Sequence, residues 1–255
     1  MSYKYSILMY NFNDYEIMRE PEEIDPECEY IYVTDNPKLQ EQTKVWKIIV
    51  DKDLDGLSTF DKCYQVRFNL FKYATTPVCI YLDGSYQIHK SLRKIYEDFM
   101  NSGSDLGLHI HFNRVDLLSE YNAWVLERNY PFSQYLKCLN YIHNNGYDFT
   151  YKGLYECSFR ICKNTELNRT LDEQVLNTLK MLGSDNTIER LDQPIYCFIL
   201  NKYFSDRMKI FPISPCWFFT GYMNHCAHRS KQCYPNMSRF TTKGYVFNNV
   251  VDLYL

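Results

Sequence analysis

The chain has 255 residues, with 28 Lys and Arg against 31 Asp and Glu, which gives a formal net charge of −3. So even a balance provides no overall attraction to nucleic acid or to an anionic membrane, and nucleic acid is not an expected partner. The length is enough to bury a core without disulfide or metal staples. We therefore expect a single α/β domain over 1–255.

The ten cysteines are scattered without CxxC pairs, and the chain opens with no hydrophobic signal segment. These features predict free thiols in a reducing compartment, and hence a cytoplasmic location. No stretch reaches the ~20 apolar residues that cross a bilayer, so a membrane association would be peripheral.

Four short apolar runs in the first third of the chain predict strands, over 4–12, 29–36, 45–51 and 77–84. Helical spacing predicts one helix over 61–74 and another over 89–103, which ends at Gly103. Alternating strands and helices predict a mostly parallel central sheet flanked by helices. Such sheets bind ligands beyond the carboxyl ends of their strands.

The rest of the chain is less regular. Its patterns predict helices over 114–129, 132–146, 170–183 and 192–203 and a strand over 153–163. Asp172 and Glu173 are expected in the first turn of the third of these helices. From Phe211 onward neither period holds, so an irregular segment packed over the site is expected.

The stretch PVCIYLDGSYQI, residues 77–88, ends a buried strand at Asp83, which Gly84 and Ser85 follow. One interpretation is an ordinary turn, in which the aspartate bonds nearby backbone and the glycine takes a positive φ. In the other, Asp83 holds a divalent ion on a nucleotide diphosphate, and Gly84 lets a ligand approach the backbone. Spacing alone favours the turn.

Two basic residues, Arg67 and Lys72, precede that strand by one helix. Isolated helix charges are usually solvated. At this place in the chain, however, they could also neutralise a phosphate.

Two groups of histidine and cysteine residues could form a zinc site. His109 and His111 lie on one side of an extended run, but spacing fixes no third ligand. A second group near the end matches no standard zinc pattern: Cys216, His225, Cys226, His228 and Cys233. A single histidine of this group, His225, could alternatively reach an ion held by Asp83.

Arg190, Asp192 and Gln193 stand at the start of the last predicted helix. Local chemistry favours a plain helix N-terminus, with Asp192 as the cap and Pro194 in the first turn.

Several motifs occur in an order that resembles a glycosyltransferase-like family of plants and bacteria, long known as a domain of unknown function. They are YNFNDYE, YIYVTDN, Trp46, RFNLFK, YLDGSYQI, HFNRVDLLSEYNAW, GLYECSFRI and ERLDQPIYCFIL, over roughly 5–203. Plant members are linked to seed-coat mucilage polysaccharide synthesis. The resemblance implies a GT-A fold, a nucleotide-sugar donor and a Mn²⁺ or Mg²⁺ ion.

Within that resemblance, Asp83 matches the aspartate that binds metal and diphosphate. Asp35 lies near the expected position of the nucleobase of the donor. The positions implied to bind the donor are Tyr10, Asp35, Arg67, Lys72, Asp83, Gly84, Ser85, His111, Arg114, Arg160, Arg190 and Gln193. Two departures matter. Ser85 stands where the usual signature has a second carboxylate, which puts metal dependence in question, and Leu191 splits the family's RDQ triplet.

The resemblance predicts transfer of a sugar from a nucleotide sugar to a glycan or polysaccharide acceptor, in surface or capsular polysaccharide synthesis. Asp192 is expected to act as the base or to orient the donor, with Glu156 as the second candidate for the base. Residues 1–115 would form the nucleotide-sugar half and 116–255 the acceptor half. Aromatic side chains suited to stacking on an acceptor sugar are Trp217, Phe218, Phe219 and Tyr222, although a core role fits them equally.

Two alternatives belong to other classes of protein. One is a non-catalytic module that binds a glycan or a nucleotide. The other is an interaction protein stabilised by zinc at the group around His225.

Overall fold

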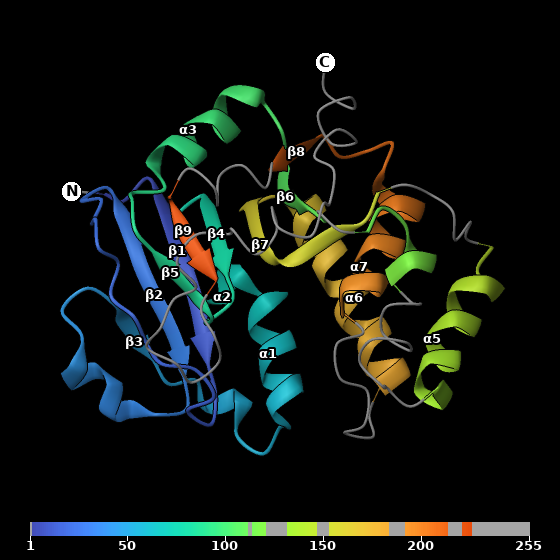
Figure 1. Ribbon diagram of the computed structural model, residues 1–255, viewed down its shortest axis with the longest axis horizontal. Helices are drawn as coiled ribbons and strands as arrows, with labels where there is room; N and C mark the ends of the chain where they lie inside the picture. Colours follow the sequence, from blue (N-terminus) through green and yellow to red (C-terminus); the bar gives the residue numbers. More distant parts are fainter. Residues whose placement is uncertain are drawn as a thin grey trace, which may run out of the picture.

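A computed structural model describes residues 2–111, 114–120, 132–146, 153–183, 192–213 and 221–225. Its centre is a seven-stranded sheet in the order β3-β2-β1-β4-β7-β6-β8 (Figure 1). Within this sheet only β7 runs against its neighbours. The strands are β1 Tyr5–Asn11, β2 Cys28–Thr34, β3 Lys47–Ile49, β4 Val78–Leu82, β6 Leu106–Ile110, β7 Tyr155–Lys163 and β8 Ile210–Ile213. The expected mostly parallel α/β sheet is confirmed.

Helices cover both faces of this sheet. They are α1 Thr59–Arg67, α2 Leu70–Tyr73, α3 Arg93–Ser102, α5 Phe132–Asn144, α6 Glu166–Gly183 and α7 Asp192–Ile199. Two short 3-10 helices, η1 Pro37–Gln42 and η2 Lys52–Leu54, and the π-helix η3 Leu200–Phe204 complete the set of described helices. Leu8 and Tyr10 of β1 pack in one core with α1, α2, α6 and α7, whereas Ile7 and Met9 pack in the other with α3. Because both faces are covered, all of β1 is buried, which explains the apolar run from Ile7 to Tyr10.

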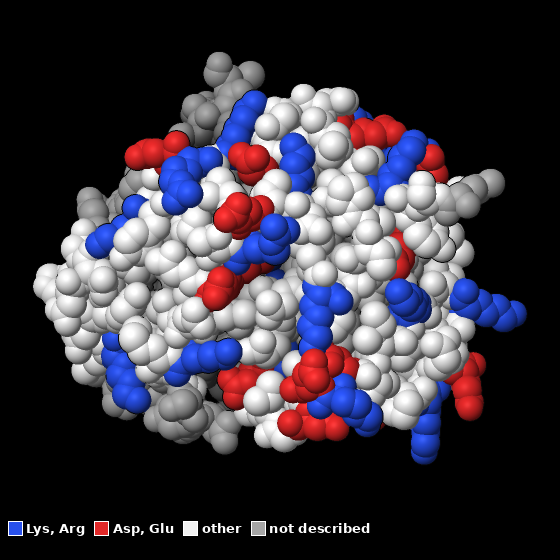
Figure 2. Space-filling view, turned by 180° about the vertical axis from the view of Figure 1, so that it is seen from behind, with Lys and Arg blue, Asp and Glu red and all other residues white. Residues whose placement is uncertain are grey.

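One face of the molecule shows the same even balance of charge. On the face seen in Figure 2, basic and acidic side chains are interspersed. None of the described helices combines the length and the apolar character that crossing a membrane requires. The seven cysteines in the described ranges are free thiols.

One predicted helix is interrupted. The expected helix over 61–74 divides into α1 and α2, because Phe68 and Asn69 leave the helical conformation. Phe68 is buried and its ring stacks on Tyr196 of α7, with 5.8 Å between ring centroids. This break ends α1 at Arg67.

The irregular segment expected from Phe211 onward is wrong for its first residues. Ile210–Ile213 form the edge strand β8 beside β6, where Pro212 is tolerated because an edge needs fewer backbone donors. A second small sheet joins β5 Tyr86–Ile88 to β9 Met223–His225. Residues 214–220 and 226–236 of that expectation lie outside the described ranges.

Asp172 is also placed differently from the expectation. Helix α6 begins at Glu166, so Asp172 lies in its second turn and is buried. Its carboxylate accepts from both Nη1 and Nη2 of Arg160, at 2.9 and 3.0 Å. The Arg160 guanidinium lies 5.0 Å from the ring centroids of both Phe68 and Tyr196. Arg160 Nη2 also donates to the Arg67 carbonyl oxygen at 3.1 Å, so this buried pair holds the end of α1.

Removing one member of this pair should be costly. We expect Asp172→Asn to lower the free energy of unfolding by about 3–5 kcal/mol, because it leaves the Arg160 charge buried without a counter-charge. Asp98→Asn is the matched control, since Asp98 pairs with Lys94 at the surface of α3 and should cost no more than about 1 kcal/mol. Urea denaturation of both variants measures the difference, and equal small losses would contradict the assignment.

Candidate active site

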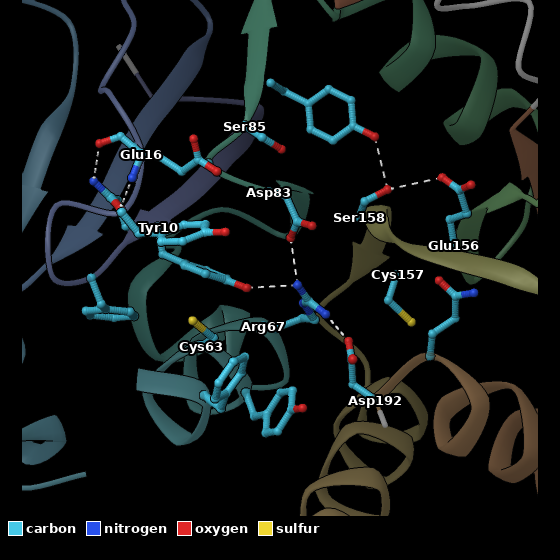
Figure 3. A pocket seen from close by; sticks show the side chains of 18 of the residues that line it. Tyr10, Glu16, Cys63, Arg67, Asp83, Ser85, Glu156, Cys157, Ser158 and Asp192 are labelled. Atoms are coloured by element: carbon cyan, nitrogen blue, oxygen red, sulfur yellow. Dashed lines mark hydrogen bonds and ion pairs between the residues drawn. The ribbon is translucent and has the colours of Figure 1, made fainter. Parts of the chain in front are cut away.

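A pocket of about 680 Å³ opens at the carboxyl ends of β1 and β4 (Figure 3). Its walls come from the end of β1, from α1, from the turn after β4, from β7 and from the start of α7. Of the residues predicted to form a site, those lining it are Tyr10, Arg67, Asp83, Gly84, Ser85, His111, Arg114, Glu156, Asp192 and Gln193. Segments far apart in the chain thus converge where the sheet topology predicts a ligand.

Arg67 is the centre of this pocket. Its Nη2 donates to Asp83 Oδ1 at 2.7 Å and to the Tyr10 hydroxyl at 2.8 Å. Its Nε donates to the Tyr81 hydroxyl at 3.1 Å, and its Nη1 donates to Asp192 Oδ2. One guanidinium therefore joins carboxylates from opposite walls, as Figure 3 shows.

The charge of Arg67 is secure although its side chain is only 11% exposed. Burial acts to lower its pKa, but the charge of Asp83, with the hydroxyl oxygens of Tyr10 and Tyr81 beside the guanidinium, outweighs burial and raises the pKa well above its ordinary value. Burial in turn raises the pKa values of Tyr10 and Tyr81, so both hydroxyls keep their protons. The pocket thus contains a permanent cation in a partly dry environment.

The turn after β4 is a backbone turn whose carboxylate faces the pocket. The Tyr86 N–H donates to the Asp83 carbonyl at 3.1 Å, which is turn chemistry, and the Asp83 carboxylate faces the pocket. Gly84 is not among the glycines with positive φ, so the reason that the turn interpretation gave for this glycine is wrong. A Cβ at Gly84 would lie 2.5 Å from the Tyr10 carbonyl oxygen, and this close approach to β1 excludes a side chain.

An irregularity in β7 brings three consecutive residues to the pocket. The pairing of β6 with β7 jumps from Leu108 opposite Arg160 to His109 opposite Glu156. Glu156, Cys157 and Ser158 all line the pocket, whereas a regular strand would turn alternate residues away. The sequence shows no sign of this bulge.

A second polar group lies beside the bulge. His109 Nδ1 is 3.0 Å from Glu156 Oε2, and His111 Nε2 lies 3.7 Å from Glu156 Oε1 and 3.6 Å from Glu120 Oε2. Arg114 Nε donates to Glu120, and the Arg114 N–H donates to His111 Nδ1 at 3.1 Å. Burial lowers the pKa of His111 despite both glutamates, so His111 is neutral near pH 7.

The opposite end of the pocket is aromatic, which sequence reasoning missed. With Tyr10, its rings are Phe12, Tyr15, Phe60 and Tyr64. The spacing of Phe60, Tyr64 and Arg67 on one helical face was a signal that could have found it. Burial raises the pKa of the Cys63 and Cys157 thiols to about 12, so neither is a nucleophile at neutral pH.

Three predicted donor-binding residues do not line the pocket. Asp35 accepts from the Asn13 N–H at 2.9 Å and pairs with Lys62 at 3.1 Å. Lys72 pairs with Asp51 and Asp53 at the surface, at 2.6 and 2.8 Å.

The third, Arg160, is committed to Asp172 behind the pocket wall. Arg190 lies outside the described ranges. For His225 only the backbone is described, and it pairs with Tyr86 next to the turn.

The described side chains do not form a complete site for Mn²⁺ or Mg²⁺. No group of three or more His, Cys, Asp or Glu that could hold a metal occurs within the described ranges, so the pair of His109 and His111 forms no zinc site there. Among the described residues of the lining there is nevertheless an acidic excess, with five carboxylates against the two guanidiniums of Arg67 and Arg114. These carboxylates belong to Glu16, Asp83, Glu120, Glu156 and Asp192. An anionic ligand would therefore enter more readily with a cation.

No family model and no curated protein matches the sequence. Among solved structures, the chain is similar to the crystal structure of mouse xyloside xylosyltransferase 1 in its apo form. The similarity covers 88% of this chain and 97% of that one, with a TM-score of 0.47 and 12% sequence identity. The functional proposal accordingly rests on the pocket itself.

Gly84→Ala tests the close approach of the turn to β1. The added Cβ would overlap the Tyr10 carbonyl, so we expect a loss of about 1–3 kcal/mol in the free energy of unfolding. Gly56→Ala is the comparison: it has open space but a φ of +80°, and strain alone should cost about 1 kcal/mol. Thermal denaturation ranks the two, and a smaller loss for Gly84→Ala would contradict the packing argument.

The lowered pKa of His111 predicts a pH dependence of stability. As the pH falls below 6.5, the ordinary pKa of a histidine, His111 binds a proton in the unfolded chain but stays unprotonated in the folded protein. The free energy of unfolding should therefore decrease as the pH is lowered, by at most roughly 1.4 kcal/mol per pH unit from this group. The decrease ends at the pH where His111 of the folded protein is protonated too. His111→Gln should flatten the unfolding free energy between pH 7 and 5, and an unchanged slope would show that His111 is not the cause.

Proposed function

We propose that this chain is a glycosyltransferase that uses a nucleotide-sugar donor. The observation that carries the proposal is the Arg67 guanidinium, held between Asp83 and Asp192 at the carboxyl edge of a parallel sheet. The pocket volume of about 680 Å³ suits a ligand of nucleotide-sugar size, since small-molecule pockets span roughly 300–1,000 Å³.

The two ends of the pocket suit the two parts of such a donor. The aromatic end offers flat apolar rings, suited to a nucleobase. The polar end offers carboxylates, a neutral histidine and hydroxyls, suited to the hydroxyl groups of a sugar. Arg67 lies between them, where the diphosphate of the donor would be.

The chemistry of transfer needs this arrangement. Breaking the bond between sugar and diphosphate develops negative charge on the leaving group and positive character on the sugar. Arg67 supplies a fixed cation for the first charge. Asp192 and Glu156 supply carboxylates for the second.

The acidic excess adds a requirement. A nucleotide diphosphate entering alone would meet five carboxylates, so we expect binding to depend on a divalent cation, with Asp83 as one ligand. His225 remains a predicted second ligand, because its backbone lies beside Tyr86.

The acceptor is the finer part of the proposal. The family resemblance supports a glycan or polysaccharide of the cell surface or capsule. The aromatic residues 217–219, predicted to stack on such an acceptor, lie outside the described ranges. A non-catalytic nucleotide- or glycan-binding module is the competing function, and it predicts ligand binding without turnover.

Thermal stabilisation tests the donor site. We expect UDP or GDP to raise the melting temperature in the presence of Mn²⁺ and to have little effect without it. Ligand at 100 times its dissociation constant stabilises by about 2.7 kcal/mol, which is readily measured. Asp83→Asn should abolish the shift.

Asp53→Asn is the control, since Asp53 pairs with Lys72 away from the pocket and its loss should leave the shift intact. A panel in which no nucleotide or nucleotide sugar raises the melting temperature would reject the proposal. So would an Asp83→Asn variant that responds like the wild type.

A further inference from the structure

We infer that Glu156 is the base that removes the proton from the acceptor hydroxyl, and that His109 positions it. The inference rests on the proposed function. It chooses between the two carboxylates that the sequence left open for this role.

The position of Glu156 fits a base. It lies in the pocket wall with 18% of its side chain exposed, whereas His109 behind it is only 2% exposed. The bulge in β7 turns Glu156 into the pocket together with Ser158, and Figure 3 shows the two side by side. A proton acceptor must be reachable by substrate and held still, and this pair meets both needs.

The two oxygens of the Glu156 carboxylate have different neighbours. His109 Nδ1 lies 3.0 Å from Oε2, and the Ser158 hydroxyl donates to the same oxygen at 3.4 Å. With a proton on Nδ1, His109 donates to this oxygen and fixes the orientation of the carboxylate. Oε1 lies 3.7 Å from His111 Nε2, and we assign it as the oxygen that receives the proton of the substrate.

Asp192 is less suited to this task. Its side chain is 7% exposed, and its Oδ2 accepts from Arg67. It also stands at the first residue of α7, where the positive end of the helix dipole favours the carboxylate anion. These contacts tie Asp192 to Arg67, which it positions.

The step balances without a co-reactant. The acceptor oxygen forms a bond to the anomeric carbon while its proton passes to Glu156 Oε1. The bond from the anomeric carbon to the diphosphate oxygen breaks, and its electron pair leaves with the diphosphate beside Arg67. Glu156 then releases the proton to solvent. A single displacement of this kind inverts the configuration at the anomeric carbon.

Chemical rescue tests the assignment without knowledge of the acceptor. The wild type is incubated with Mn²⁺ and UDP-glucose, UDP-galactose, UDP-xylose or UDP-N-acetylglucosamine, with water or sodium azide as the nucleophile. We expect Glu156→Ala still to bind these donors but to hydrolyse them about 10²–10⁴-fold more slowly. Azide has no proton to lose, so it should restore turnover in Glu156→Ala and give a glycosyl azide of inverted configuration.

Matched variants separate the base from general damage. Glu173→Gln changes an exposed glutamate on α6 and should leave hydrolysis unchanged. His109→Leu should move the acid limb of the pH–rate profile to higher pH, because Glu156 loses a bond to its charged form. His109→Asn, whose amide can donate to the same oxygen, should move it less.

The outcomes distinguish this inference from the proposed function. If no nucleotide sugar binds the wild type, both are overturned. If donors bind but wild-type turnover is absent, if Glu156→Ala hydrolyses as fast as the wild type, if azide gives no rescue, or if the product keeps its configuration, the base assignment falls and donor binding stands.

Discussion

The contact on which the pocket depends is the bridge from Arg67 to Asp83 and Asp192. One carboxylate follows the central strand β4 and the other begins α7, more than a hundred residues later in the chain. Without the guanidinium, these two negative charges would lie in a poorly hydrated space with no positive charge between them. Behind it, Arg160 holds the Arg67 carbonyl and is itself paired with Asp172. A chain of contacts therefore runs from Asp172 in the core through Arg160 to Arg67, and it fixes the position of the Arg67 guanidinium in the pocket.

Two features of the backbone give this cation an accessible pocket. Gly84 lets the turn after β4 lie against the Tyr10 carbonyl, closer than any side chain would permit. The bulge in β7 places Glu156 and Ser158 on the same wall. Arg67 lies between the aromatic end and the polar end of this pocket. A ligand with a flat ring, a charged middle and a hydroxylated tail matches that order, which is why a nucleotide sugar is the proposed donor.

The sequence predicted what depends on local pattern. Strands buried on both faces read as apolar runs, and Asp83 and Asp192 were found because they mark a strand exit and a helix start. It could not predict contacts that depend on distant packing. Lys72 and Arg67 look alike along the chain, yet one ends at the surface with Asp51 and the other in the pocket. The edge strand β8 was missed because a proline and a short length hide the strand period, and the bulge in β7 has no local signature.

A double-mutant cycle on Arg67 and Asp192 tests the central claim most directly. The free energies of unfolding of Arg67→Met, Asp192→Asn and the double variant, compared with the wild type, give the coupling between the two side chains. The bridge predicts a favourable coupling of about 1–3 kcal/mol, as for charged residues in direct contact. If the losses in the two single variants add up to the loss in the double variant to within about 0.3 kcal/mol, the two residues do not interact. That result would contradict the bridge through Arg67.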